Sequence, residues 1–148
     1  MKRGKKIGLI LLGVFVVMQF FRITKTNVPV VASNDFIEMT NPSPEVKGIL
    51  KSACYDCHSN ESRYPWYSEV APVSWWLQHH IDEGKEHLNF SIWGTYSEKR
   101  ADHKLEECAE EVEEGEMPLN SYTWTHSDAR LSAEQKELLE NFFNYLRQ

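Results

Sequence analysis

The most constraining feature of the sequence is the run Cys54-Tyr55-Asp56-Cys57-His58. Two thiols three residues apart lie on one side of a helical turn, so both can form thioethers to the two vinyl groups of one porphyrin. The histidine that follows them is placed to put an imidazole nitrogen on the iron, as a proximal ligand does. A Cys-x-x-Cys-His run is the attachment signature of c-type haem. The sequence therefore predicts one covalently attached haem c, held by Cys54, Cys57 and His58.

Two other interpretations of these residues stay open. Cys54, Cys57, His58 and Cys108 could together form a Cys3His zinc site that staples an interaction module. The second interpretation is a redox-active Cys-x-x-Cys pair. Such a pair normally lies beside a βαβ pattern, and no such pattern is present here. With only three cysteines in 148 residues, the chain is not a disulfide scaffold.

Formal charge is distributed unevenly along the chain. Six of the 16 basic residues lie at or before Lys25, and no acidic residue precedes Asp35. The remainder has ten basic and 22 acidic residues, which gives it a formal charge of −12. Such a domain has little reason to bind nucleic acid, because that affinity comes mainly from Lys and Arg on phosphates. We expect instead a redox partner protein with a basic docking face.

Residues 1–22 resemble a bacterial signal anchor. A basic head, residues 1–6, precedes an apolar run over residues 7–21. These 15 residues are short against the ~20 that a spanning helix needs, but the flanking basic side chains could snorkel to make up the difference. A passable cleavage site at residues 30–32 lies far beyond the apolar run. We therefore expect an uncleaved transmembrane helix in the inner membrane, with the rest of the chain in the periplasm.

Beyond the anchor, the sequence predicts a linker and one all-α domain. Residues 23–42 mix Thr, Asn, Val and Pro without a helical period and indicate the linker. Apolar residues at helical spacing predict the domain over residues 43–148. Ser43 as N-cap begins a helix that delivers Cys54. Three further helices are expected, from Pro72 to Gly84, from Glu98 to Glu114, and after a capping box formed by Ser132 and Gln135.

Candidates for the second axial ligand lie after the motif. Gly115 closes the helix that ends at Glu114, and this break frees Met117, whose thioether is the preferred distal ligand. His80 lies on the expected apolar face of its helix, with Val73, Trp76 and Leu77, and is an alternative. His126 is the reserve ligand.

Two further residues near these candidates are assigned roles. Arg63 lies in the aromatic loop after His58 and could pair with a haem propionate. Cys108 repeats with Ala101, Leu105 and Val112 along one stripe of its helix. We therefore expect Cys108 to be a small core residue first, which weakens the zinc interpretation.

Several longer motifs accompany the Cys-x-x-Cys-His run. They are CYDCHSNE (54–61), YPWYS (64–68), APVSWWL (71–77), LNFS (88–91), GEMPL (115–119) and ARLS (129–132). With these motifs, the sequence from about residue 46 to residue 146 resembles the bacterial haem-binding domain family, which is similar in outline to class I cytochromes c. The resemblance implies a small class I cytochrome c-like fold, covalent haem at Cys54 and Cys57, His58 as proximal ligand and Met117 as distal ligand.

The sequence as a whole predicts a membrane-anchored c-type haem protein that carries electrons on the periplasmic side of the inner membrane and is not an enzyme. Two alternatives to this function remain, a haem-based sensor with a displaceable distal site and an accessory haem domain of a peroxidase-like system. Relatives in the resembled family can be fused to cytochrome c or di-haem peroxidase modules. This chain has no second Cys-x-x-Cys-His run, which argues against a stand-alone peroxidase.

Overall fold

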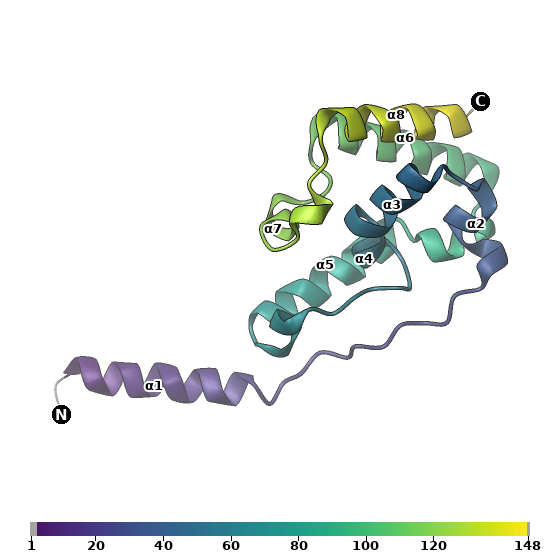
Figure 1. Cartoon of the computed structure of the whole chain (residues 1–148). Helices are drawn as coiled ribbons and strands as arrows, with labels where there is room; N and C mark the ends of the chain where they lie inside the picture. The colour runs from purple at the N-terminus through teal and green to yellow at the C-terminus, as the bar shows by residue number, and fades with distance from the viewer. Residues whose placement is uncertain (1–2, 148) are drawn as a thin grey trace.

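The computed structural model describes residues 3–147. Over these residues the chain is helical and contains no β-strand, which confirms the all-α class. Figure 1 shows α6 and α8 side by side, with α3, α4 and α5 beneath them and α1 standing apart. The α-helices are α1 (Arg3–Met18), α2 (Phe36–Thr40), α3 (Pro44–Ala53), α4 (Tyr55–His58), α5 (Val73–His87), α6 (Glu98–Glu114), α7 (Asn120–Thr123) and α8 (Ala133–Leu146), and the 3-10 turns are η1 (Ala32–Asn34), η2 (Trp66–Glu69), η3 (Phe90–Thr95) and η4 (Ser127–Ala129).

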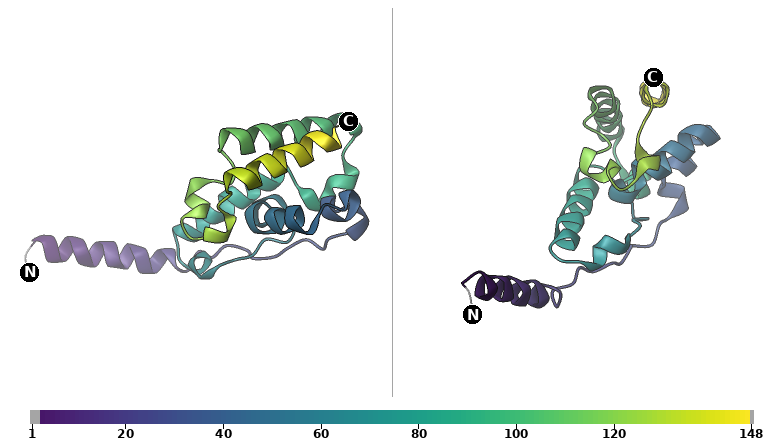
Figure 2. Two further views of the ribbon diagram at one scale, coloured as in Figure 1. Left: turned by 45° about the horizontal axis from the view of Figure 1, so that its top comes forward. Right: turned by 60° about the vertical axis from the view of Figure 1, so that its left-hand side comes forward.

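The first helix, α1, projects away from the other helices in every view (Figures 1 and 2). None of its side chains is buried. Among residues 3–147, no helix combines the length and the apolarity needed to cross a membrane. The transmembrane anchor expected over residues 1–22 therefore has no support here and stays a prediction. Met1 and Lys2 of its basic head lie outside the described residues.

Residues 19–27, which we call the strap, lie against the start of α5. The side-chain amide of Gln19 pairs twice with the backbone of Ala71, donating to its carbonyl at 3.0 Å and accepting from its N–H at 3.0 Å. The indole N–H of Trp75 donates to the carbonyl of Phe21 at 2.7 Å. The strap is therefore attached to the domain through backbone groups of both partners.

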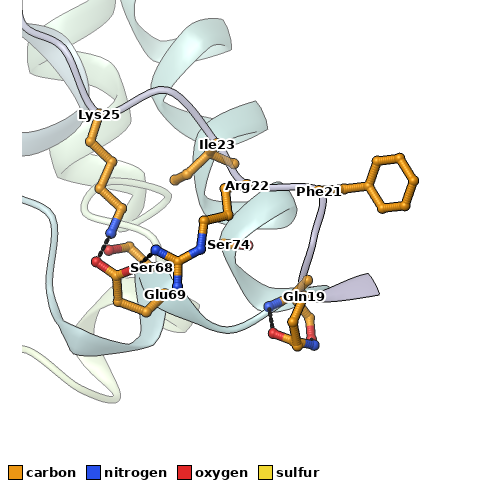
Figure 3. Close-up of a pocket in the computed structure, with 9 residues that line it drawn as sticks. Gln19, Phe21, Arg22, Ile23, Lys25, Ser68, Glu69 and Ser74 are labelled. Carbon is orange, nitrogen blue, oxygen red and sulfur yellow. Dashed lines mark hydrogen bonds and ion pairs between the residues drawn. The ribbon is translucent and has the colours of Figure 1, made fainter. Parts of the chain in front are cut away.

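Ion pairs add to this attachment, as Figure 3 shows. Glu69 accepts from Lys25 and lies 3.1 Å from the guanidinium of Arg22. Further along, the amide of Asn27 donates to the carbonyl of Ser62 at 2.9 Å. The strap, η2 and the start of α5 line a small cavity of about 220 Å³.

The segment expected as a linker, residues 23–42, also contains η1 and α2. Phe36 of α2 is 0 % exposed and belongs to the main hydrophobic core. Asp35 caps α2 by accepting from the backbone N–H of Ile37 at 3.0 Å, and it also accepts from the Tyr55 hydroxyl at 3.1 Å. A helix of five residues is too short to show a period in the sequence, so its part in the core was not foreseen.

Local helix signals in the sequence are confirmed. Ser43 caps α3 by accepting from the backbone N–H of Val46, and α6 has the expected bounds. Gly115 ends α6 in the left-handed conformation, with φ of 77°. Ser132 and Gln135 form the expected capping box of α8. These features depend on residues within a few positions of each other, which is why the sequence alone predicts them.

The prediction for α5 is wrong in two respects. The helix continues to His87, because Gly84 serves as a close packing point inside the helix and not as its end. Val73 and Trp76, expected on the buried face, are 42 % and 45 % exposed. A neighbouring face of the helix is buried instead, and α4 approaches it closely at Gly84. The buried residues of α5 are Ser74, Leu77, Ile81 and Gly84.

An aromatic core holds α4 in place. Tyr55, the residue after Cys54, is almost fully buried and stacks on Phe90, with ring centroids 5.3 Å apart and an interplanar angle of 6°. Phe36 packs on the same Phe90 ring at 4.9 Å. The motif is therefore fixed to the core through Tyr55, which lies between Cys54 and Asp56.

Candidate functional site

The two cysteines of the motif lie at the junction of α3 and α4. Cys54 joins the two helices, and its backbone N–H donates to the carbonyl of Leu50 at 3.0 Å. Both thiols are free and half-buried. Burial raises the pKa of Cys54 to about 12, with a further contribution from Cys57, and burial raises the pKa of Cys57 to about 11. Both side chains are therefore neutral thiols near pH 7 in this environment.

The imidazole of His58 is oriented by α5. Its Nδ1 lies 2.9 Å from the carbonyl oxygen of Gly84 and 3.2 Å from that of Leu88. Two acceptors at Nδ1 require the proton there, so Nε2 keeps its lone pair. Burial lowers the pKa of His58 below its ordinary value, which keeps the ring neutral at pH 7. A neutral imidazole with its Nδ1–H held by a backbone carbonyl is the arrangement of a metal-ligating histidine.

His58 faces a cavity of about 600 Å³ between α4, α5, α6 and α7. This volume lies within the range of about 300–1,000 Å³ that small-molecule and cofactor sites occupy. Cys57 lines the cavity, whereas Cys54 packs against the core beside it. The lining residues are Ala53, Cys57, His58, His80, Glu83, Gly84, His87, Leu88, Glu107, Cys108, Glu111, Met117, Pro118, Leu119 and Tyr122.

Met117 lines the same cavity from the segment that follows α6. After the turn at Gly115, the backbone N–H of Met117 donates to the carbonyl of Glu111 at 3.0 Å. The side chain is half-buried. The structure thus brings a thioether from the segment after α6 and an imidazole from α4 to one cavity, although 59 positions of chain separate His58 from Met117.

Comparison with known families matches the haem-binding domain model to residues 13–145. This chain belongs to the haem-binding domain family. The match covers most of the sequence and includes the strap and α2 as well as the motif. Comparison with curated proteins gave no match, and comparison with solved structures gave none either.

The residues of this haem-binding domain fit a haem c by their chemistry. The site offers two neutral thiols, one imidazole with a free Nε2 and one thioether, and three of these four side chains line one cavity. Such a set can supply two thioether links and two axial ligands to one haem. The individual roles of Cys54, Cys57, His58 and Met117 remain predictions.

The other histidines of the haem-binding domain are placed differently. His80 lines the main cavity and an adjoining apolar cavity of about 220 Å³, and its Nδ1 lies 2.9 Å from the carbonyl oxygen of Trp76. His126 is not among the residues that line either cavity, and its ring stacks on Tyr122 at 4.1 Å. His87 also lines the main cavity. The sequence did not single it out, because the two residues before it, Lys85 and Glu86, are charged.

Arg63 is bound to a partner that the sequence analysis did not assign. Its Nε donates to the two carboxylate oxygens of Asp56, at 3.0 Å and 3.3 Å. This ion pair raises the pKa of Arg63. Arg63 is not among the residues that line the main cavity, so its role as a propionate partner stays a prediction. Asp56 was missed because a lone acid between two cysteines carries no signal of its own.

Cys108 lines the main cavity from α6 and is half-buried, as a small core residue would be. Burial raises the pKa of its thiol, with Cys54 adding to the effect. Within residues 3–147, no group of three or more His, Cys, Asp or Glu side chains is arranged to hold a metal ion. The Cys3His set of Cys54, Cys57, His58 and Cys108 is therefore not assembled in this fold.

Proposed function

We propose that this haem-binding protein is a c-type cytochrome that carries electrons. In this proposal Cys54 and Cys57 hold one haem c through thioethers, and His58 and Met117 are its axial ligands. The observation that carries the proposal is the imidazole of His58, whose Nδ1 is held by the carbonyls of Gly84 and Leu88. That arrangement leaves Nε2 as the only ring nitrogen with a lone pair, at the wall of the cavity.

A haem in this site would supply one-electron chemistry, and the protein would tune it. The carbonyls that accept from His58 raise the basicity of the imidazole and fix its plane. Apolar lining residues such as Leu88 and Leu119 would lower the polarity around the haem. A methionine ligand raises the reduction potential relative to a second histidine, so we expect a fairly positive midpoint.

An electron carrier needs a partner, and we propose that this partner presents a basic docking face. Three acidic residues, Glu83, Glu107 and Glu111, line the main cavity. The chain beyond Lys25 has ten basic and 22 acidic residues. Complementary charge would steer association and make its rate fall as ionic strength rises.

The proposed location is the outer face of a bacterial inner membrane. It rests on sequence, because a basic head and an apolar run precede the domain. The prediction can be tested by fractionation of cells that express the full chain. Release of the whole protein by osmotic shock would contradict membrane attachment. Retention in the cytoplasm would contradict export. It would also contradict covalent attachment of haem on the outer side of the inner membrane.

The first test of the function is a pyridine haemochrome spectrum after acid–acetone extraction of the protein, expressed with a haem-maturation system. A c-type spectrum that stays with the protein pellet supports attachment through two thioethers. Haem that is extracted by the solvent contradicts covalent attachment and favours the sensor alternative. A protein that binds no haem at all overturns the proposal.

The distal ligand is tested by Met117→Ala. This change should abolish the methionine-to-iron absorption band at the red end of the spectrum and lower the reduction potential. Met39→Ala is the matched control, because Met39 is exposed and lies outside the lining of both cavities. If the parent protein lacks the band and its reduced form binds carbon monoxide readily, the distal site is open. That result would favour a sensor with His80 near the iron.

A further inference from the structure

The segment with Met117 forms one part of the cavity wall. It leaves α6 at Gly115 and returns to the core at Ala129, which is fully buried. Between these points α7 forms a single helical turn beside α4 and α5 (Figure 1). Met117, Leu119 and Tyr122 of this segment, which we call the cover, all line the main cavity.

Tyr122 connects the cover to the motif helix. Its hydroxyl donates to the Oδ2 of Asp56 at 2.7 Å and also lies 3.4 Å from the carbonyl oxygen of Ser52. These contacts join positions 66 and 70 residues apart in the chain. The ring itself is half-buried and lines both cavities, so it lies between the carboxylate and the cavity that Met117 and His58 also line.

Asp56 is well suited to hold this hydroxyl. It is 7 % exposed and lies between the two cysteines on α4. Arg63 compensates its charge, donating from its backbone N–H at 3.3 Å and from Nε at 3.0 Å. Because the carboxylate is buried and ionic, the hydrogen bond from Tyr122 is of the charge-assisted kind, which is about twice as strong as one between neutral groups.

We propose that Asp56 and Tyr122 form a clasp that positions the cover, and with it Met117, opposite His58. Asp56 is thus a positioning residue that acts through Tyr122 and does not itself touch the cofactor. The inference deepens the proposed function and rests on it where Met117 is concerned. The clasp itself is a contact between α4 and α7 and can be tested separately.

The test is hydrogen exchange in the full-length protein as purified, with Tyr122→Phe removing the hydroxyl alone. The backbone N–H groups of residues 122–124 donate to carbonyls within the cover, so their exchange reports its opening. Loss of a hydrogen bond to a buried carboxylate should speed their exchange roughly ten- to hundredfold. Amides in α8 should be unaffected. Tyr145→Phe is the matched control, because Tyr145 is 70 % exposed.

A double-mutant cycle with Asp56→Asn separates the clasp from general loss of packing. If the two residues act on each other, the double variant should open the cover little more than Tyr122→Phe alone. Additive effects of the two changes would overturn the proposal. So would exchange in the cover that stays within about twofold of the parent protein in Tyr122→Phe.

Absorption spectra and carbon monoxide binding provide a further test, because a residue that only stabilised the fold would not change them. Tyr122→Phe should weaken the methionine-to-iron band and speed carbon monoxide binding to the reduced protein, while Tyr145→Phe leaves both unchanged. In a Met117→Ala background, Tyr122→Phe should still speed exchange in the cover. If the parent protein lacks the band, the assignment of Met117 fails, and the exchange comparison still decides whether the clasp exists.

Discussion

Replacing Gly84 with alanine should force α5 away from α4. A Cβ at this position would lie 3.0 Å from the carbonyl oxygen of Cys57 and 3.3 Å from both its carbonyl carbon and its Cβ. Two of these three atoms are backbone atoms, which cannot swing aside as the far end of a flexible side chain can. The same displacement would lengthen the 2.9 Å contact between His58 Nδ1 and the Gly84 carbonyl.

Two opposing effects set the size of the change. Alanine is favoured over glycine inside a helix by about 1 kcal/mol, whereas overpacking a well-packed site costs about 1–3 kcal/mol. Because the obstructing atoms belong to α4, which Tyr55 fixes to the core, we expect the packing cost to prevail. The free energy of unfolding should fall by about 1 kcal/mol and by no more than about 2 kcal/mol.

Guanidinium unfolding followed by circular dichroism measures this change, and Gly48→Ala is its matched control. Gly48 lies in α3, is exposed, and leaves open space where a Cβ would lie, so alanine there should stabilise by about 0.5–1 kcal/mol. The two variants should move the unfolding midpoint in opposite directions. If Gly84→Ala stabilises as much as Gly48→Ala does, the close approach of α4 does not constrain this position, and the reasoning is refuted.

Three further predictions concern Tyr55, Glu69 and Cys108. Tyr55→Phe should lower the free energy of unfolding by about 1–3 kcal/mol, because the buried Asp35 loses the hydroxyl that donates to it, and equal unfolding curves would contradict this. The hydrogen bond from Lys25 is the chief reason why the pKa of Glu69 lies below its ordinary value of 4.5. The ion pair therefore stabilises strap attachment fully at pH values above 4.5, and this stabilisation is lost as the pH falls through the lowered pKa of Glu69. NMR of the strap amides between about pH 7 and about pH 3 should show release only at the acid end. Burial raises the pKa of Cys108, so iodoacetamide at mildly alkaline pH should modify this thiol much faster after unfolding, and equally rapid reaction of the folded protein would contradict a raised pKa.

The motif residues show how far the sequence reaches into the site. The spacing of Cys54, Cys57 and His58 predicts the kind of cofactor, because the chemistry of attachment acts within one helical turn. The same spacing says nothing of the acceptors for His58, since Gly84 and Leu88 lie 26 and 30 residues away. Placing Gly84 at a helix end was wrong because glycine serves two purposes, as a helix terminator and as a point of close approach.

Among the candidate ligands, the cavity separates residues that the sequence could only place in an order of preference. Met117 and His80 line it, His126 does not, and His87 joins it from the last turn of α5. A helical period shows that a face is buried but does not identify what lies opposite. His87 follows two charged residues, Lys85 and Glu86, so nothing in the sequence indicated that it lines the cavity.

Local physics explains what could be foreseen in this protein. Helix caps, the left-handed turn at Gly115 and the attachment motif each depend on side chains and backbone groups a few residues apart, so the order of residues determines them. The tautomer of His58, the burial of Phe36 and the contact between Asp56 and Tyr122 depend on groups that only packing brings together. Separation along the chain does not determine separation in space, so only the folded structure could establish these features.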